Sequence, residues 1–145
     1  MKRLALLAAL FVIIATAAPV KAEAPCPLCF VASWVDTPNG AELPIDNAWL
    51  SGWAFKCSNG ETPISIAAYV TQGGTETQVM TLIGYHARPD VSAMAVSVGC
   101  GNPALPGFAV GLGGEFDLGA ASVRLVATAA NGMSSQQVRS ITFVE

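Results

Sequence analysis

Short apolar segments recur along the chain, and residues that favour turns separate them. Seven such segments have β-forming composition: residues 29–35, 48–57, 63–71, 78–85, 107–112, 122–129 and 137–144. Their separators contain glycine, asparagine and proline, as in Gly73-Gly74 and Asn131-Gly132. No window keeps apolar residues at i, i+3, i+4 and i+7, the spacing of a packed amphipathic helix. The pattern therefore predicts an all-β fold, specifically an antiparallel immunoglobulin-like sandwich of about seven strands.

Alternation within the strands predicts which side chains face the core. Isoleucine, alanine and valine occupy every second position from residue 64 to 70, and Val, Leu and Ala do so from 123 to 127. Arg124 and Tyr69 are expected on the solvent-exposed faces of their strands. Trp53, beside Gly52, is expected to fill the gap between the sheets. Residues 87–95 are expected to hold one helical turn, and residues 23–145 to form a single domain.

The first 22 residues have the pattern of an export signal. Lys2 and Arg3 give a positive start, an apolar run follows, and residues 20–22 (Val-Lys-Ala) suit a cleavage site. We therefore predict removal of residues 1–22. The alternatives are cleavage after Ala24, an uncleaved anchor and a lipoprotein. An apolar run of about 15 residues is shorter than the roughly 20 of a spanning helix, and the residues before Cys26 lack a lipidation pattern.

Composition and charge exclude several classes of protein. The chain has 145 residues, of which 52% are hydrophobic and 12% are charged, and this argues against disorder. Beyond residue 22, ten acidic side chains outnumber four basic ones, so the net charge is −6. Such a domain lacks the basic stripe that nucleic-acid binding requires. We expect a secreted or periplasmic protein with no membrane span after signal cleavage.

Four cysteines behind an export signal predict two disulfides, for which three connectivities exist. The preferred arrangement joins Cys57 to Cys100 and closes Cys26 to Cys29 locally, and a crossed arrangement is the alternative. A redox role for Cys26 and Cys29 stays open because their spacing lowers a thiol pKa, although no βαβ context surrounds them. A metal site built from the four thiolates is a further alternative, although such sites usually have two close pairs.

Few side chains in this sequence suit catalysis. His86 is the single histidine and would have to serve any Ser-His-Asp or Cys-His arrangement. The motifs of nucleophile elbows, phosphate loops and zinc proteases do not occur. We therefore expect no enzyme, no cofactor and no metal site. A calcium site is the remaining alternative, formed by the loop oxygens of Asp36, Asn39, Glu42 and Asp46.

Four short motifs occur in a fixed order along the chain: Asp36-Thr37-Pro38-Asn39-Gly40, Gly52-Trp53-Ala54, Arg88-Pro89-Asp90-Val91 and Gly107-Phe108. Over about residues 35–144 the chain thereby resembles bacterial immunoglobulin-like domains with a D-x-P-x-x-G, G-W-A, R-P-D-V, G-F frame. These domains are found on exported proteins and beside glycosyltransferases or amidases. The resemblance implies an accessory, non-catalytic sandwich and carries over no catalytic residue.

The chain departs from this frame at three places. Gly40 comes one position early, and residues 55–57 (Phe-Lys-Cys) stand where the family usually has an acidic residue. Residues 71–74 (Thr-Gln-Gly-Gly) replace a Val-Asp-Gly turn. The resemblance therefore assigns no ligand site that uses those acidic residues. Asp36 is expected to organise a turn through its own side chain.

The expected function is a non-catalytic exported module that contacts a glycan or a protein partner. Exposed aromatic side chains are the usual platforms for sugars, and the candidates are Trp34, Trp49 and Tyr69, with core packing as the alternative for each. Arg88 and Asp90 are expected to cap and orient a turn, with a binding surface as the alternative. Two other functions stay open: a structural subunit of an envelope assembly that acts through a sheet edge, and a thiol-redox or metal protein.

Overall fold

The computed structural model describes residues 29–62 and 64–145. The predictions for residues 1–22 and for Cys26 lie outside this part of the chain. The strands are β1 (Val31–Val35), β2 (Ala41–Pro44), β3 (Trp49–Lys56), β4 (Ser65–Gln72), β5 (Thr75–His86), β6 (Gly107–Gly113), β7 (Gly119–Thr128) and β8 (Ser134–Val144). A 3-10 turn (Ile45–Asn47) and helix α1 (Pro89–Ser97) accompany them. Neither helix in these residues has the length and apolar character to cross a bilayer.

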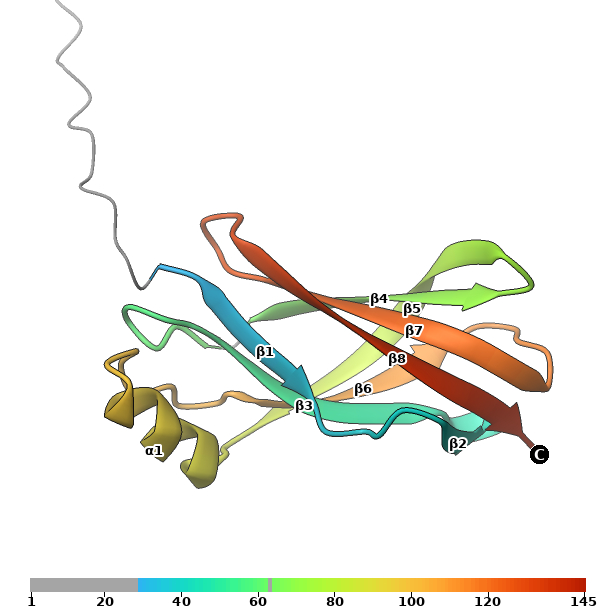
Figure 1. The fold of residues 1–145 in the computed structure, drawn as a ribbon, viewed down its shortest axis with the longest axis horizontal. Coiled ribbons are helices and arrows are strands. Elements are labelled where there is room, and N and C mark those ends of the chain that lie inside the picture. The colour runs from blue at the N-terminus through green and yellow to red at the C-terminus, as the bar shows by residue number, and fades with distance from the viewer. Residues whose placement is uncertain (1–28, 63) are drawn as a thin grey trace, which may run out of the picture.

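The strands lie in two sheets that share β5 (Figure 1). Sheet A has the order β1-β3-β6-β5, and sheet B has the order β5-β4-β7-β8-β2. Residues 75–79 of β5 pair with β4, whereas residues 80–86 pair with β6. The pairing is antiparallel except between β2 and β8, which run parallel. Strand β5 therefore crosses from one sheet to the other.

The main core lies between the two sheets, and strand alternation selects its members. The largest contributions come from Leu50, Ile64, Ile66, Val70, Phe108, Val110, Val123, Leu125, Ile141 and Phe143. Tyr69 and Arg124 occupy the intervening positions of β4 and β7 and are only partly buried. The predicted alternation in these two strands is therefore confirmed, because a sheet with one covered face buries every second residue.

A second buried cluster lies beside helix α1. It is formed by the residues Phe55, Cys57, Val91, Ala95 and Cys100, with Trp53 packed against it. The rings of Trp53 and Phe55 stack with their centroids 5.6 Å apart. The prediction that Trp53 fills the gap between the sheets is wrong. Its neighbour Ala54 belongs to the main core, so alternation along the strand turns Trp53 to the other face.

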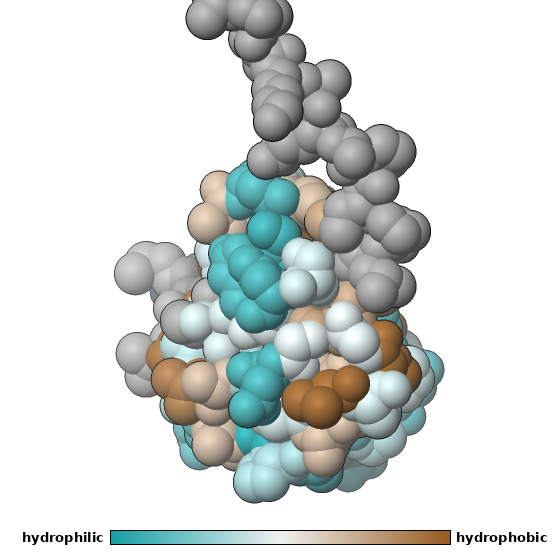
Figure 2. All heavy atoms as spheres, turned by 90° about the vertical axis from the view of Figure 1, so that its left-hand side faces the viewer, coloured by the Kyte–Doolittle hydropathy of each residue, from teal (hydrophilic) through white to brown (hydrophobic). Residues whose placement is uncertain are grey.

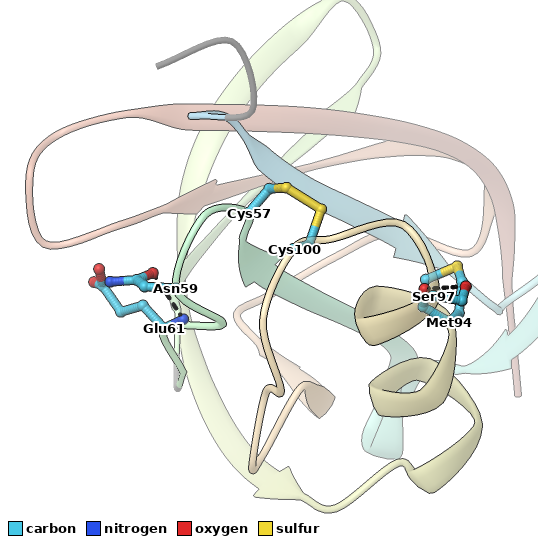
Figure 3. The surroundings of a disulfide bond; sticks show 6 residues. All are labelled: Cys57, Asn59, Glu61, Met94, Ser97 and Cys100. Atoms are coloured by element: carbon cyan, nitrogen blue, oxygen red, sulfur yellow. Dashed lines mark hydrogen bonds between the residues drawn. A yellow bond between two sulfur atoms is a disulfide. The ribbon is translucent and has the colours of Figure 1, made fainter. Parts of the chain in front are cut away.

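A disulfide joins Cys57 at the end of β3 to Cys100 in the loop after α1, 43 positions later (Figure 3). The preferred pairing of these two cysteines is thus confirmed, and the crossed arrangements are wrong. The bond also rules out a metal site made from all four thiolates. Cys29 is disulfide-bonded as well, and its predicted partner, Cys26, lies outside the described residues. Such bonds fit an oxidising environment.

Side chains of β8 cover the outer edge of β1. Gln137 Nε2 donates a hydrogen bond to the Ser33 carbonyl oxygen (3.2 Å), and Arg139 Nη2 donates one to the Val35 carbonyl oxygen (2.9 Å). The hydroxyls of Ser33 and Ser135 are 2.6 Å apart and share a hydrogen bond. These bonds occupy backbone carbonyls of the kind that an edge strand otherwise leaves to solvent.

The elements differ from the prediction in number and length. Each of the seven predicted segments contains a strand, but the described residues have eight, because β2 was not predicted. An isolated bridge also joins Lys56 and Glu61. Helix α1 has nine residues rather than a single turn. Gly73 and Gly74 connect β4 to β5 with φ of +59° and +83°, as a two-residue hairpin turn requires.

Candidate functional site

Three tryptophans occupy the outward face of sheet A. Trp34 of β1 pairs with Trp53 of β3. Trp49 lies four residues before Trp53 on the same strand. Paired residues share a face, and positions i, i+2 and i+4 of a strand point the same way, so the three indoles lie on one side. We call this surface the tryptophan face and define it by Trp34, Trp49, Trp53 and the small residues Ser51, Gly84 and Ala109.

Trp49 lies at one end of the tryptophan face and is 38% exposed. Its Nε1 donates a hydrogen bond to Asn47 Oδ1 at 2.6 Å. A Cβ placed on Gly111 of the neighbouring strand β6 would lie 3.0 Å from the indole ring. The ring therefore rests against a glycine of the adjacent strand, and its polar group is satisfied within the protein.

Trp34 lies at the other end of this face and is 51% exposed. The guanidinium carbon of Arg139 is 4.9 Å from the ring centre. Arg139 is itself fixed, because its Nη2 and Nε donate to the carbonyl oxygens of Val35 and Thr37. Beside Trp34 is a hollow of about 210 Å³ lined by residues 34–39 and Arg139. The cation–π contact orients the ring while half of the residue stays in solvent.

Small residues and one ion pair lie beside the two exposed indoles. Asp36 follows Trp34 by two positions and its N–H donates to the Ser51 carbonyl oxygen, so its side chain lies on this face, where Arg88 binds it. Ser51, Ala109 and Gly84 lie side by side on β3, β6 and β5. A Cβ added to Gly84 would meet no atom within 4 Å, so the space above it is open. Trp49 and Trp53 are four residues apart along β3, a span of about 13 Å. The residues that define the face carry no charge, and the paired charges of Asp36 and Arg88 border them.

Arg88 lies at the start of α1 and is held by two carboxylates. Its Nε and Nη2 donate to the two oxygens of Asp90 at 2.9 and 2.7 Å. Its Nη1 donates to Asp36 Oδ2 at 2.8 Å. Asp36 was expected to organise a turn through its side chain, but it pairs instead with an arginine 52 positions away. The network connects the ends of β1 and β5 with the start of α1. Arg88, the residue that precedes α1, makes no side-chain capping hydrogen bond, so the two residues orient this segment through ion pairs and not through a cap.

The ion pairs of Arg88 with Asp36 and Asp90 predict that the stability of the protein depends on pH. Hydrogen bonds from Arg88 lower the pKa of Asp90 from 3.8 to about 2. The folded protein therefore binds fewer protons at this site than the unfolded chain, and its stabilising contribution is present above about pH 4 and is lost towards pH 2. In Arg88→Met we expect the pKa of Asp90 to return towards its ordinary value, as measured by carboxyl NMR titration. Arg124→Met, the control, should leave this pKa unchanged, and an unchanged value in Arg88→Met would contradict the prediction.

Tyr69 lies on the outward face of sheet B and is not part of the tryptophan face. The guanidinium carbon of Arg124 is 4.1 Å from the centre of the Tyr69 ring. Arg124 also makes two hydrogen bonds to the carboxylate of Glu76, at 2.6 and 3.0 Å. These bonds lower the pKa of Glu76. One face of the Tyr69 ring is thus occupied by a paired arginine, which makes it a weaker candidate for sugar stacking than Trp34.

The other candidate residues do not assemble into a site. His86 is exposed at the end of β5, near Gly107. Asp36 binds Arg88, and Asn39 Oδ1 accepts a hydrogen bond from the Ser140 amide. Within residues 29–62 and 64–145, no group of three or more His, Cys, Asp or Glu side chains is arranged to hold a metal ion. The four oxygen donors considered for calcium are therefore not brought together.

Comparison with known proteins adds no family to this geometry. Neither a protein-family model nor a curated protein matches the sequence.

A second concave feature was not anticipated from the sequence. A groove of about 580 Å³ lies between the β4–β5 hairpin and the segment that follows β6. Its lining residues are Val70, Gln72, Thr75, Thr77, Gln78, Val79, Gly113, Gly114, Glu115 and Phe116. Its sequence signal is threonine at positions 75 and 77, where an alternating strand would ordinarily place apolar residues inward. The groove is within the size range of ligand sites.

Proposed function

We propose that this protein is a non-catalytic exported binding module and that its tryptophan face contacts a glycan. The observation that carries the proposal is the pair of partly exposed indoles, Trp34 and Trp49, on one sheet face. Ser51 lies between them on β3, beside Asp36, whose carboxylate is paired with Arg88. Aromatic side chains combine a large apolar surface with a polar group, so they suit ligands that are partly apolar and partly hydroxylated.

The strand order supports an immunoglobulin-like topology for the module. Sheet A follows the order β1-β3-β6-β5, and β4, β7 and β8 are neighbours in sheet B. In the immunoglobulin fold the corresponding sheets hold strands A, B, E and D and strands C, F and G. The parallel pair β2–β8 and the crossing of β5 extend this arrangement beyond seven strands. Domains of this architecture commonly serve in recognition at the cell surface.

The anchoring of both indoles favours a binding role. Trp49 is held by Asn47, and Trp34 by the contact with Arg139. Rings that are already fixed lose little side-chain entropy when a ligand binds. A glycan that lies along β3 over Ser51 would contact both indoles, and the small residues Ala109 and Gly84 leave room for it to extend over β6 and β5.

Binding to an array of neutral glycans, followed by calorimetry on the best ligand, tests the proposal. We expect Trp34→Ala and Trp49→Ala each to weaken binding about thirtyfold, since removal of a central aromatic contact costs about 2 kcal/mol. Val138→Ala is the matched control, because Val138 is 51% exposed and lies on sheet B. The absence of glycan binding, or equal binding by all three variants, would contradict the proposal.

A structural role through edge-to-edge strand contacts is less well supported at β1. Its carbonyls at Ser33 and Val35 already accept hydrogen bonds from Gln137 and Arg139. A partner strand would have to displace both side chains. Binding at a sheet face therefore has the stronger structural support of the two functions.

A further inference from the structure

The first half of β5 is an open sheet edge. Residues 75–79 pair with β4 on one side, and the pairing of β5 with β6 begins only at Met80. In the part of the chain that the structure describes, no strand pairs with the other side of residues 75–79. This edge belongs to the β4–β5 hairpin, which projects at the end of the molecule opposite to α1 (Figure 1).

The hairpin geometry identifies the backbone groups that face outward from this edge. A two-residue turn makes Gln72 and Thr75 a hydrogen-bonded pair, and hydrogen-bonded pairs recur at every second position. Thr75, Thr77 and Val79 therefore bond to β4. The N–H and C=O groups of Glu76 and Gln78 point away from β4 and are available to another strand.

The groove of about 580 Å³ runs beside this edge. Val70, Val79 and Phe116 supply its apolar surface. Phe116 is fixed by parallel stacking on Phe143, with ring centroids 4.7 Å apart. Gln72 donates to the Asp117 carbonyl oxygen (2.8 Å) and accepts from the Asp117 amide (3.0 Å). These contacts hold the far wall in place, so the groove is formed before anything enters it.

The other sheet edges include the outer edge of β1, strand β2 and residues 134–139 of β8, which pair with β7 alone. The outer edge of β1 carries the side-chain bonds from β8. Strand β2 has four residues and ends at Pro44, which has no N–H to donate. Among the edges that the structure describes, residues 75–79 combine unpaired backbone groups with an adjacent apolar groove.

Charge indicates the chemistry of the occupant. Glu115 lines the groove and makes no ion pair with any described residue. No basic side chain lines the groove, and the chain beyond residue 22 has a net charge of −6. A second copy of this chain would bring another acidic groove to the same edge, so an unlike, basic partner is favoured.

We propose that the free edge of β5 binds an extended segment of another protein by strand addition. Main-chain hydrogen bonds form with Glu76 and Gln78, alternate apolar side chains enter the groove, and a basic side chain reaches Glu115. Alternate side chains of an added strand point to one side, which is how such sites combine backbone affinity with sequence preference. This partner surface is separate from the tryptophan face.

The test uses four synthetic peptides and isotope-labelled protein with its disulfides intact. The first two, acetyl-TVTVTKT-amide and acetyl-TKTVTVT-amide, place two valines and a lysine on one side in both chain directions. The other two carry Glu in place of Lys. We expect one lysine peptide to shift the amide NMR signals of Glu76 and Gln78 and to protect these amides from hydrogen exchange. Thr75 and Thr77 already bond to β4 and should change less.

Matched variants separate the backbone contribution from the charge contribution. Gln78→Pro removes an outward N–H and should weaken binding more than tenfold, whereas Gln78→Ala keeps the N–H and should bind normally. Glu115→Lys should weaken the lysine peptide about three- to fivefold and strengthen the Glu peptide by a similar factor. Asp117→Lys changes the charge equally just outside the groove and should have less effect.

Several results would overturn the proposal. No perturbation of Glu76 and Gln78 by any peptide at millimolar concentration would do so, as would normal binding by Gln78→Pro. If Gln78→Pro does not fold, the exchange pattern of the unaltered protein decides: protection that does not alternate between residues 75 and 78 contradicts strand addition. Trp34→Ala should bind the peptides normally, so failure of the glycan proposal would leave this result unaffected.

Discussion

Replacement of both Cys57 and Cys100 by alanine is expected to lower the free energy of unfolding by about 4 kcal/mol. The bond closes a loop of 43 positions, and a cross-link of that length removes about 4 kcal/mol of chain entropy from the unfolded state. Both cysteines are buried against Phe55, Val91 and Ala95. The bridge therefore also holds α1 on the outward face of sheet A. Urea unfolding followed by tryptophan fluorescence measures the loss.

A volume-preserving variant separates the cross-link from packing. Cys57→Val with Cys100→Val keeps apolar atoms in the second cluster but removes the covalent bond. We expect this variant to lose nearly as much stability as the alanine pair. Stability close to that of the unaltered protein in the valine pair would show that packing, and not the cross-link, stabilises this end of the molecule.

Gly52→Ala is expected to destabilise the protein by about 3 kcal/mol, the upper part of the range for overpacked cores. Gly52 pairs with Val35 of β1 and with Phe108 of β6. An added Cβ would overlap the carbonyl oxygen of Trp34 and would lie 2.6 Å from Phe108 Cζ. Backbone and a buried ring cannot both move away, so β1 should shift. Thermal unfolding measures the loss of stability.

The matched control for this substitution is Gly84→Ala. Gly84 is also within a strand of sheet A, but a Cβ there would meet no atom within 4 Å. We expect its unfolding free energy to stay within about 0.5 kcal/mol of the unaltered protein or to rise slightly. Equal stability of the two variants would contradict the prediction. It would show that the backbone of Trp34 and the ring of Phe108 move aside at little energetic cost.

Much of the strand structure was predictable, because alternation depends on neighbouring residues. Ile66, Ala68 and Val70 are buried as their spacing indicates. Strand β2 was not predictable in the same way. It has four residues, includes Glu42 and Pro44, and is defined by a parallel pairing with β8 about 100 positions later. A short segment carries no local signal of so distant a partner.

The candidate site was predictable only in part. Alternation places Trp34, Trp49 and Trp53 by face, but it does not show which part of that face another element covers. Trp53 packs against the cluster beside α1, whereas Trp34 and Trp49 stay partly exposed. Contacts between residues far apart in the sequence, such as Arg88 with Asp36, likewise could not be predicted from the local sequence pattern. The sequence also did not show that the apolar side chains of Met94, Val96 and Val98, in and after α1, are exposed. Figure 2 shows the end of the molecule that carries α1, where hydrophobic (brown) and hydrophilic (teal) residues both reach the surface.

The closure of β1 by β8 also constrains the order in which the fold is completed. Gln137 and Arg139 bind β1 across 104 positions of chain, and β2 pairs with β8 over a similar distance. Strand β1 precedes β8 by about 100 residues, so the hydrogen bonds at the outer edge of β1 are complete only when β8 has folded beside it. Contacts of such long range make folding slow. Until β8 is in place, the outer edge of β1 stays open to other chains.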